Sequence, residues 1–123
     1  MIELIKNPLP NCDRALIGDC KLIGYALNPH SERGRLKPRD FNSALRFNLS
    51  NWEQLKQAIL ETLPYYEAKL TRQTAFGKKY KVVLPITGIN KRTVNVITIW
   101  QFDGLPDGTF NDYPRLITLY IST

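Results

Sequence analysis

The chain has 123 residues, a length that predicts one domain over residues 1–123 without a second core. Hydrophobic residues make up 43% and charged residues 23%, which excludes a disordered tail, a collagen-like fibre and a coiled coil. Lys and Arg number 17 and Asp and Glu 11, giving a formal charge of +6. A basic surface on a small domain favours a polyanionic or acidic partner.

The start of the chain lacks the pattern of a signal peptide, because Glu3 and Pro8 interrupt any basic start and apolar run. No stretch approaches the roughly 20 apolar residues of a membrane span, so we expect a cytoplasmic protein without a membrane partner. The spacing of Cys12 and Cys20 fits neither a redox pair nor a zinc site, and both are predicted to be small buried thiols. With His30 as the single histidine, we expect no metal and no cofactor.

Three helices are predicted in the first half of the chain. Apolar residues at helical spacing indicate helices over residues 20–27 and 38–47. Ser50 followed by Glu53 is a capping box, which opens a third helix that ends at Pro64.

The densest basic run lies between the first two of these helices and contains Arg33, Arg35, Lys37 and Arg39. It leads into the start of the second helix, where free N–H groups and the positive end of the helix dipole attract an anion such as phosphate. A merely solvated surface is the alternative interpretation.

From residue 66 the hydrophobic period changes from 3.6 to 2, which predicts strands. The expected strands cover residues 66–73, 79–86, 93–102 and 115–122. The third is apolar on both faces and is expected to be covered on both sides in its middle. Helices followed by an antiparallel sheet of about four strands make an α+β domain.

Residues two apart on a strand share a face, so Thr98 lies with Trp100 and Thr118 lies with Tyr120. Arg115 has the opposite parity to Thr118. The two are therefore not expected to line one site unless a bulge or the strand end intervenes.

Several short motifs carry a resemblance to a known family. They are Leu9-Pro10-Asn11 with Asp13-Arg14-Ala15, Lys21-Leu22 with Tyr25 and Leu27-Asn28-Pro29, Gly34-Arg35 with Lys37, Arg39 and Phe41, Ser43-Ala44-Leu45, Gly77 with Tyr80, and Pro114-Arg115-Leu116 with Thr118 and Tyr120. Together they resemble a small bacterial domain family of unknown function, over residues 9–120.

That family is similar to the barnase, EndoU and RelE group of metal-independent endoribonuclease toxins, which share the order of helices before an antiparallel sheet. The resemblance implies a toxin of a toxin–antitoxin pair that cleaves RNA. It also implies a cognate small antitoxin, SH3-like and encoded nearby, as the protein partner.

The family's polar pattern falls here on Lys37, Arg39, Arg92, Thr98, Trp100, Arg115, Thr118 and Tyr120. The basic run adds Arg35, and His30 is the one side chain that is a ready acid or base at neutral pH. The predicted catalytic residues are His30, Lys37, Arg92, Thr118 and Tyr120, and the predicted RNA-binding residues are Arg35, Arg39, Thr98, Trp100 and Arg115. The histidine that usually follows the family's Asn-Pro is Ser31 here, with His30 one position earlier.

Two other functions remain open from the residues. The chain can be a basic module that holds RNA or an acidic protein without chemistry, with strongly salt-dependent affinity. It can also be an interaction protein whose cationic face docks a partner subunit. Thr98, Trp100 and Tyr120 are good strand residues, for which packing in the core or on the sheet is the alternative interpretation.

Overall fold

The computed structural model describes residues 7–22, 27 and 36–122, with the side chains of residues 36–40 left out. Its helical elements are η1 (Cys12–Arg14), α1 (Asp19–Lys21), α2 (Leu36–Leu45), α3 (Trp52–Thr62) and η3 (Leu63–Tyr65). Its strands are β1 (Ala68–Thr74), β2 (Gly77–Thr87), β3 (Thr93–Asp103) and β4 (Arg115–Ile121). The predicted α+β order of helices before strands is confirmed.

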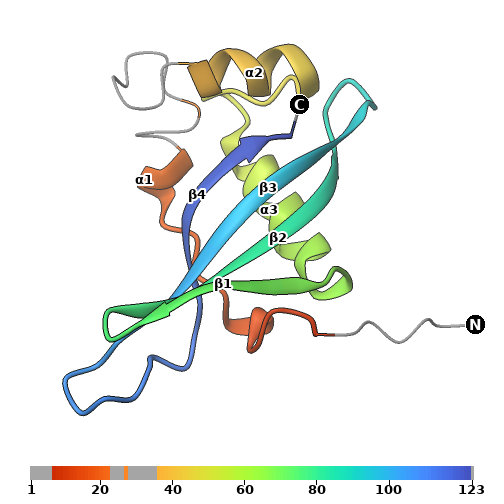
Figure 1. The fold of residues 1–123 in the computed structure, drawn as a ribbon. Helices are drawn as coiled ribbons and strands as arrows, with labels where there is room; N and C mark the ends of the chain where they lie inside the picture. The colour runs from red at the N-terminus through yellow and green to blue at the C-terminus, as the bar shows by residue number, and fades with distance from the viewer. Residues whose placement is uncertain (1–6, 23–26, 28–35, 123) are drawn as a thin grey trace, which may run out of the picture.

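The strands form one antiparallel sheet in the order β1-β2-β3-β4, so each strand pairs with its neighbour in the chain. All four predicted strands are present in the structure. In Figure 1 the sheet faces the viewer and α3 crosses behind it.

The hydrophobic core lies between the helices and one face of the sheet. Helix α3 buries Leu55 and Ile59, which lie four residues apart on one face. Strand β2 contributes every second residue, Val82, Leu84 and Ile86. The remaining large buried side chains include Leu9, Leu22, Phe41, Leu45, Phe47, Leu63, Val96, Trp100 and Leu119.

The β2–β3 turn docks on the C-terminal end of α2. The backbone N–H of Ile89 donates to the carbonyl of Leu45 at 3.0 Å, and the Asn90 side-chain amide donates to the carbonyl of Ala44 at 3.1 Å. These contacts satisfy carbonyls that the end of a helix leaves without intrahelical partners. They tie α2 to the far end of the β2–β3 hairpin.

The start of α3 differs from the predicted capping box. Asn51 is the N-cap, and Ser50 instead bonds through its hydroxyl to the side-chain oxygen of Asn48. The Asn51 side chain accepts from the Asn48 N–H at 2.8 Å and donates to the Arg46 carbonyl at 2.9 Å. Local asparagine bonding across the α2–α3 connection therefore replaces the expected pairing of Ser50 with Glu53.

The prediction of two buried thiols is wrong for Cys20, which is exposed, whereas Cys12 is half-buried. Burial raises the pKa of the Cys12 thiol, and the nearby Asp13 carboxylate raises it further. Of the helix predicted over residues 20–27, residues 23–26 lie outside the described part. No helix in the described ranges is both long and apolar enough to span a membrane.

Candidate nucleic-acid interface

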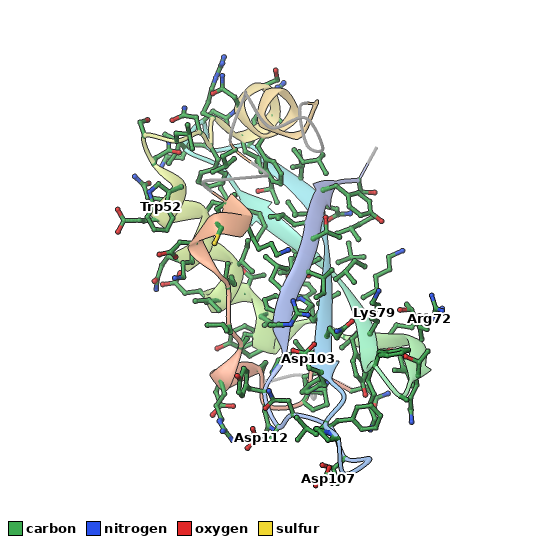
Figure 2. All side chains as sticks on the ribbon, turned by 90° about the vertical axis from the view of Figure 1, so that its left-hand side faces the viewer. Trp52, Arg72, Lys79, Asp103, Asp107 and Asp112 are labelled. Carbon is green, nitrogen blue, oxygen red and sulfur yellow. The ribbon has the colours of Figure 1, made fainter. Side chains whose placement is uncertain are left out.

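One face of the sheet is turned away from the helices, and we call it the outer face. Its side chains are Lys69 and Arg72 of β1, Lys79, Lys81 and Val83 of β2, Ile97, Ile99, Gln101 and Asp103 of β3, and Arg115, Thr118 and Tyr120 of β4. In Figure 2 the labelled Trp52 of α3 lies on one side of the sheet, and Arg72 and Lys79 lie on the other. The prediction that β3 is covered on both sides is wrong for the described residues, since Ile97, Ile99 and Gln101 are only half-buried.

A bulge in β4 brings three of the predicted site residues to this face. Trp100 pairs with Leu116 but Ile99 pairs with Thr118, so Ile117 is the extra residue. The bulge reverses the parity between Arg115 and Thr118 and puts both opposite outer-face residues of β3. A bulge was one of the two conditions under which Arg115 and Thr118 could share a face, and the structure contains that bulge.

A row of polar side chains crosses all four strands of the outer face. Arg72 pairs with Lys79, Lys79 with Gln101, and Gln101 with Arg115. Neighbouring strands lie about 4.8 Å apart, so the row spans about 14 Å. That length matches two nucleotide steps of an extended strand better than a single small anion.

Asp103 fixes one end of this row by an ion pair with Arg115. The Arg115 Nε donates to Asp103 Oδ2 at 2.6 Å and Nη2 donates to Oδ1 at 3.0 Å, a bidentate geometry. Gln101 Nε2 donates to Asp103 Oδ1 at 2.6 Å. The hydrogen bonds from Arg115 hold the pKa of Asp103 below its ordinary value, helped by the bond from Gln101, against the smaller opposing effect of burial. The paired Asp103 also raises the pKa of Arg115.

Among the described residues, Asp103 takes only part of the hydrogen-bonding capacity of the Arg115 guanidinium. Only Nε and Nη2 bond to Asp103, whereas a guanidinium has five N–H donors. Its outward edge can therefore take a phosphate oxygen while its inward edge holds the carboxylate. The ion pair therefore orients the Arg115 guanidinium without using all of its N–H donors.

A second row lies next to the first. Lys69 pairs with Lys81, Lys81 with Ile99, and Ile99 with Thr118, and Tyr120 follows beside Ile97. The two rows together place five cations on the outer face: Lys69, Arg72, Lys79, Lys81 and Arg115. Their acidic neighbours are Asp103, which is paired, and Glu67, just before β1. The outer face is therefore net positive and suits a polyanion.

Two predicted RNA-binding residues lie in the core instead. Thr98 and Trp100 are each 0% exposed. Trp100 Nε1 donates to Thr98 Oγ1 at 2.8 Å, and Thr98 Oγ1 donates to the Val82 carbonyl at 2.8 Å. This chain of bonds satisfies two polar groups inside the core, so both residues are structural and cannot contact RNA in this fold.

Arg92 is exposed, but it lies at the other end of the sheet from the polar row. Thr87 lies eight positions after Lys79 along β2, which is about 26 Å at about 3.3 Å per residue. Arg92 follows that end, in the β2–β3 turn, where its N–H donates to the Asn90 side chain at 3.2 Å. The structure therefore does not bring Arg92 together with Arg115.

The basic run and the histidine are not part of the described site. Lys37 and Arg39 fall in the first turn of α2, where the backbone alone is described, and α2 begins at Leu36. His30 and Arg35 lie outside the described residues. Their predicted roles stay predictions.

Sequence reasoning missed six site residues of the outer face, namely Lys69, Arg72, Lys79, Lys81, Gln101 and Asp103. A signal existed for Lys79, because Lys79 and Lys81 alternate with the buried residues of β2 and so must face away from the core. No signal existed for Asp103, because its pairing with Arg115 joins residues on opposite sides of a long loop.

No curated protein and no solved structure matches the chain. A family model described as a domain of unknown function (DUF6883) matches residues 8–123, which include every described strand and the whole outer face. The chain therefore belongs to the family described as domain of unknown function DUF6883.

Proposed function

We propose that this protein is a cytoplasmic toxin that binds RNA on its outer face and cleaves it without a metal ion. The observation that carries the proposal is the polar row Arg72, Lys79, Gln101 and Arg115 across all four strands. Guanidinium forks and lysine ammonium groups are the side chains that bind phosphate oxygens. The resemblance to endoribonuclease toxins supplies the reaction.

A single strand suits this face better than a duplex. The outer face is an open sheet, with half-exposed apolar side chains at Ile97, Ile99 and Tyr120 beside the cations. Sheets of this kind bind single-stranded RNA by contacting its backbone with basic groups and its unstacked bases with apolar and aromatic groups.

Cleavage would proceed by attack of the ribose 2′-OH on the adjacent phosphorus. The 2′ oxygen–phosphorus bond forms as the bond from phosphorus to the 5′ oxygen breaks. The proton lost from the 2′-OH goes to a base and another goes to the departing 5′ oxygen, leaving a 2′,3′-cyclic phosphate and a 5′-hydroxyl. Arg115 and Lys79 stabilise the extra negative charge, and Lys81 and Tyr120 are the outer-face groups that can move a proton.

Binding without cleavage is the second candidate, and one observation favours it. Asp103 is the carboxylate nearest Arg115, and its lowered pKa makes it a weak base. Proton transfer must then fall to Tyr120, to a lysine, or to His30. In either case a cognate SH3-like antitoxin would act by covering the outer face.

The test incubates the purified protein with single-stranded RNA in EDTA and analyses fragment ends. Wild type is expected to give discrete fragments ending in cyclic phosphate. Lys79→Ala should reduce binding and cleavage together, whereas Tyr120→Phe should bind RNA normally and cleave more slowly. Lys37→Ala tests the helix α2 prediction in the same assay.

Lys56→Ala is the matched control, because it removes one positive charge from α3 on the opposite side of the sheet. If the RNA binds but stays intact, the proposed cleavage is wrong and binding without cleavage is supported. If the RNA neither binds nor is cleaved, both proposed functions are wrong.

A further inference from the structure

A small pocket lies at the end of the outer face, beside the β1–β2 turn. Its volume is about 190 Å³, well below the size of a pocket for a drug-sized ligand. It is lined by Arg72, Thr74, Phe76, Gly77, Lys79 and Gln101. Phe76, in the turn, is 86% exposed. Exposure of an aromatic side chain to water is unfavourable, because burial of its apolar surface would stabilise the protein. The pocket thus combines an open aromatic ring with two cations.

The hydrogen bond to Asp103 fixes which way the Gln101 amide points. An ionised carboxylate only accepts hydrogen bonds, so the amide nitrogen must be the group that faces Asp103. The carbonyl oxygen Oε1 is left on the other side of the amide. None of the described residues donates a hydrogen bond to it, so Gln101 offers an acceptor of fixed orientation.

Gly77 allows Gln101 to lie against the pocket wall. A Cβ at position 77 would be 2.9 Å from both Cγ and Cδ of Gln101 and 3.0 Å from the Phe102 carbonyl oxygen. Those distances are shorter than real Cβ atoms show, so any larger residue would displace the glutamine side chain. The acceptor therefore depends on a glycine next to it.

We infer that this pocket takes one unpaired nucleobase that carries an exocyclic amino group. The base stacks on Phe76, its amino group donates to Gln101 Oε1, and the phosphates on either side contact Arg72 and Lys79. An amino group fits because Gln101 Oε1 lines the pocket and accepts hydrogen bonds. Uracil carries the carbonyl oxygen O4 in place of the amino group of cytosine, and O4 cannot donate to Gln101 Oε1. The inference rests on the proposed RNA binding and adds a base preference to it.

The test measures binding of single-stranded oligocytidine and oligouridine by fluorescence anisotropy in EDTA. Cytosine and uracil share ring size and differ in the amino group, so the pair isolates that contact. A 2′-fluoro group replaces each 2′-OH, which removes the nucleophile and prevents cleavage. We expect about fivefold tighter binding of oligocytidine, the contribution of one hydrogen bond.

Two variants separate the contacts. Gln101→Met should lower the affinity for oligocytidine to that for oligouridine, because it keeps the length of the side chain and removes the acceptor. Phe76→Ala should weaken both oligonucleotides by about fivefold or more through lost stacking. Tyr65→Ala, which removes another exposed ring remote from the pocket, should change neither affinity.

Four results would overturn the inference. Equal binding of the two oligonucleotides by wild type, or a preference that survives in Gln101→Met, would contradict the amino-group contact but not the RNA binding. Unchanged binding by Phe76→Ala would contradict stacking on Phe76. Absence of binding to either oligonucleotide would contradict both the proposed function and the base pocket.

Discussion

Asp103 organises the outer face although it carries the charge opposite to its surroundings. It holds the Arg115 guanidinium at two points and the Gln101 amide at a third. Sequence and resemblance pointed to Arg115, but they gave no reason to pair it with Asp103, twelve residues earlier. The pairing depends on the conformation of the loop between β3 and β4, which places Arg115 beside Asp103. No local sequence pattern predicts that conformation.

The ion pair predicts a pH dependence of stability that Asp103→Asn should remove. The folded-state pKa of Asp103 is lowered, so its stabilisation is present above the unfolded-state pKa near 3.9. It is lost as the pH falls through the folded-state pKa. Urea unfolding should therefore show the largest gap between wild type and Asp103→Asn near neutral pH, shrinking below about pH 4. A gap that stays constant into strong acid would contradict this assignment.

At the scale of elements, the strands could be predicted and the bulge in β4 could not. Alternation of Tyr80, Val82, Leu84 and Ile86 with Lys79, Lys81 and Val83 predicts the strand and its two faces. Ile117 looks like any other strand residue, and only the pairing of β4 with β3 makes it the extra one. The same limit applies to Trp100, since a central strand is apolar on both faces and its sequence does not say which face the helices cover.

The docking of the β2–β3 turn on α2 predicts that Gly88→Ala is strongly destabilising. A Cβ at this position would be 2.3 Å from the backbone oxygen of Leu45 and 2.6 Å from its Cα. Backbone atoms at a helix end cannot move aside as a side-chain tip does, so the hairpin and α2 must separate. We expect a loss of about 2 kcal/mol or more in the free energy of unfolding, measured with urea.

Gly18→Ala is the control, because a Cβ there has no neighbour within 4 Å. Its stability should stay within about 0.5 kcal/mol of wild type. Equal effects of the two substitutions would show that the contact of the turn with α2 does not matter to the fold.

For the whole molecule, the net charge of +6 was evident from composition, but its distribution was not. The pleat explains the distribution, because lysines and arginines at alternate strand positions all emerge on the side away from the core. The sequence directed attention to Lys37 and Arg39, whereas five of the described cations lie together on the outer face of the sheet. The regular alternation of Lys79 and Lys81 is typical of ordinary solvent-facing strand residues. Their membership of a group of cations on the outer face is evident only from the pairing of the four strands.

The salt dependence of RNA binding tests whether the cations of the outer face contact the RNA backbone. For a single strand, the logarithm of the association constant falls with the logarithm of salt concentration by about 0.7 for each phosphate neutralised. Lys79→Ala/Lys81→Ala should therefore make the slope shallower by about 1.4 relative to wild type. Lys56→Ala, on the helical side, should leave the slope unchanged. Equal slopes for wild type and the double variant would contradict an RNA site on the outer face.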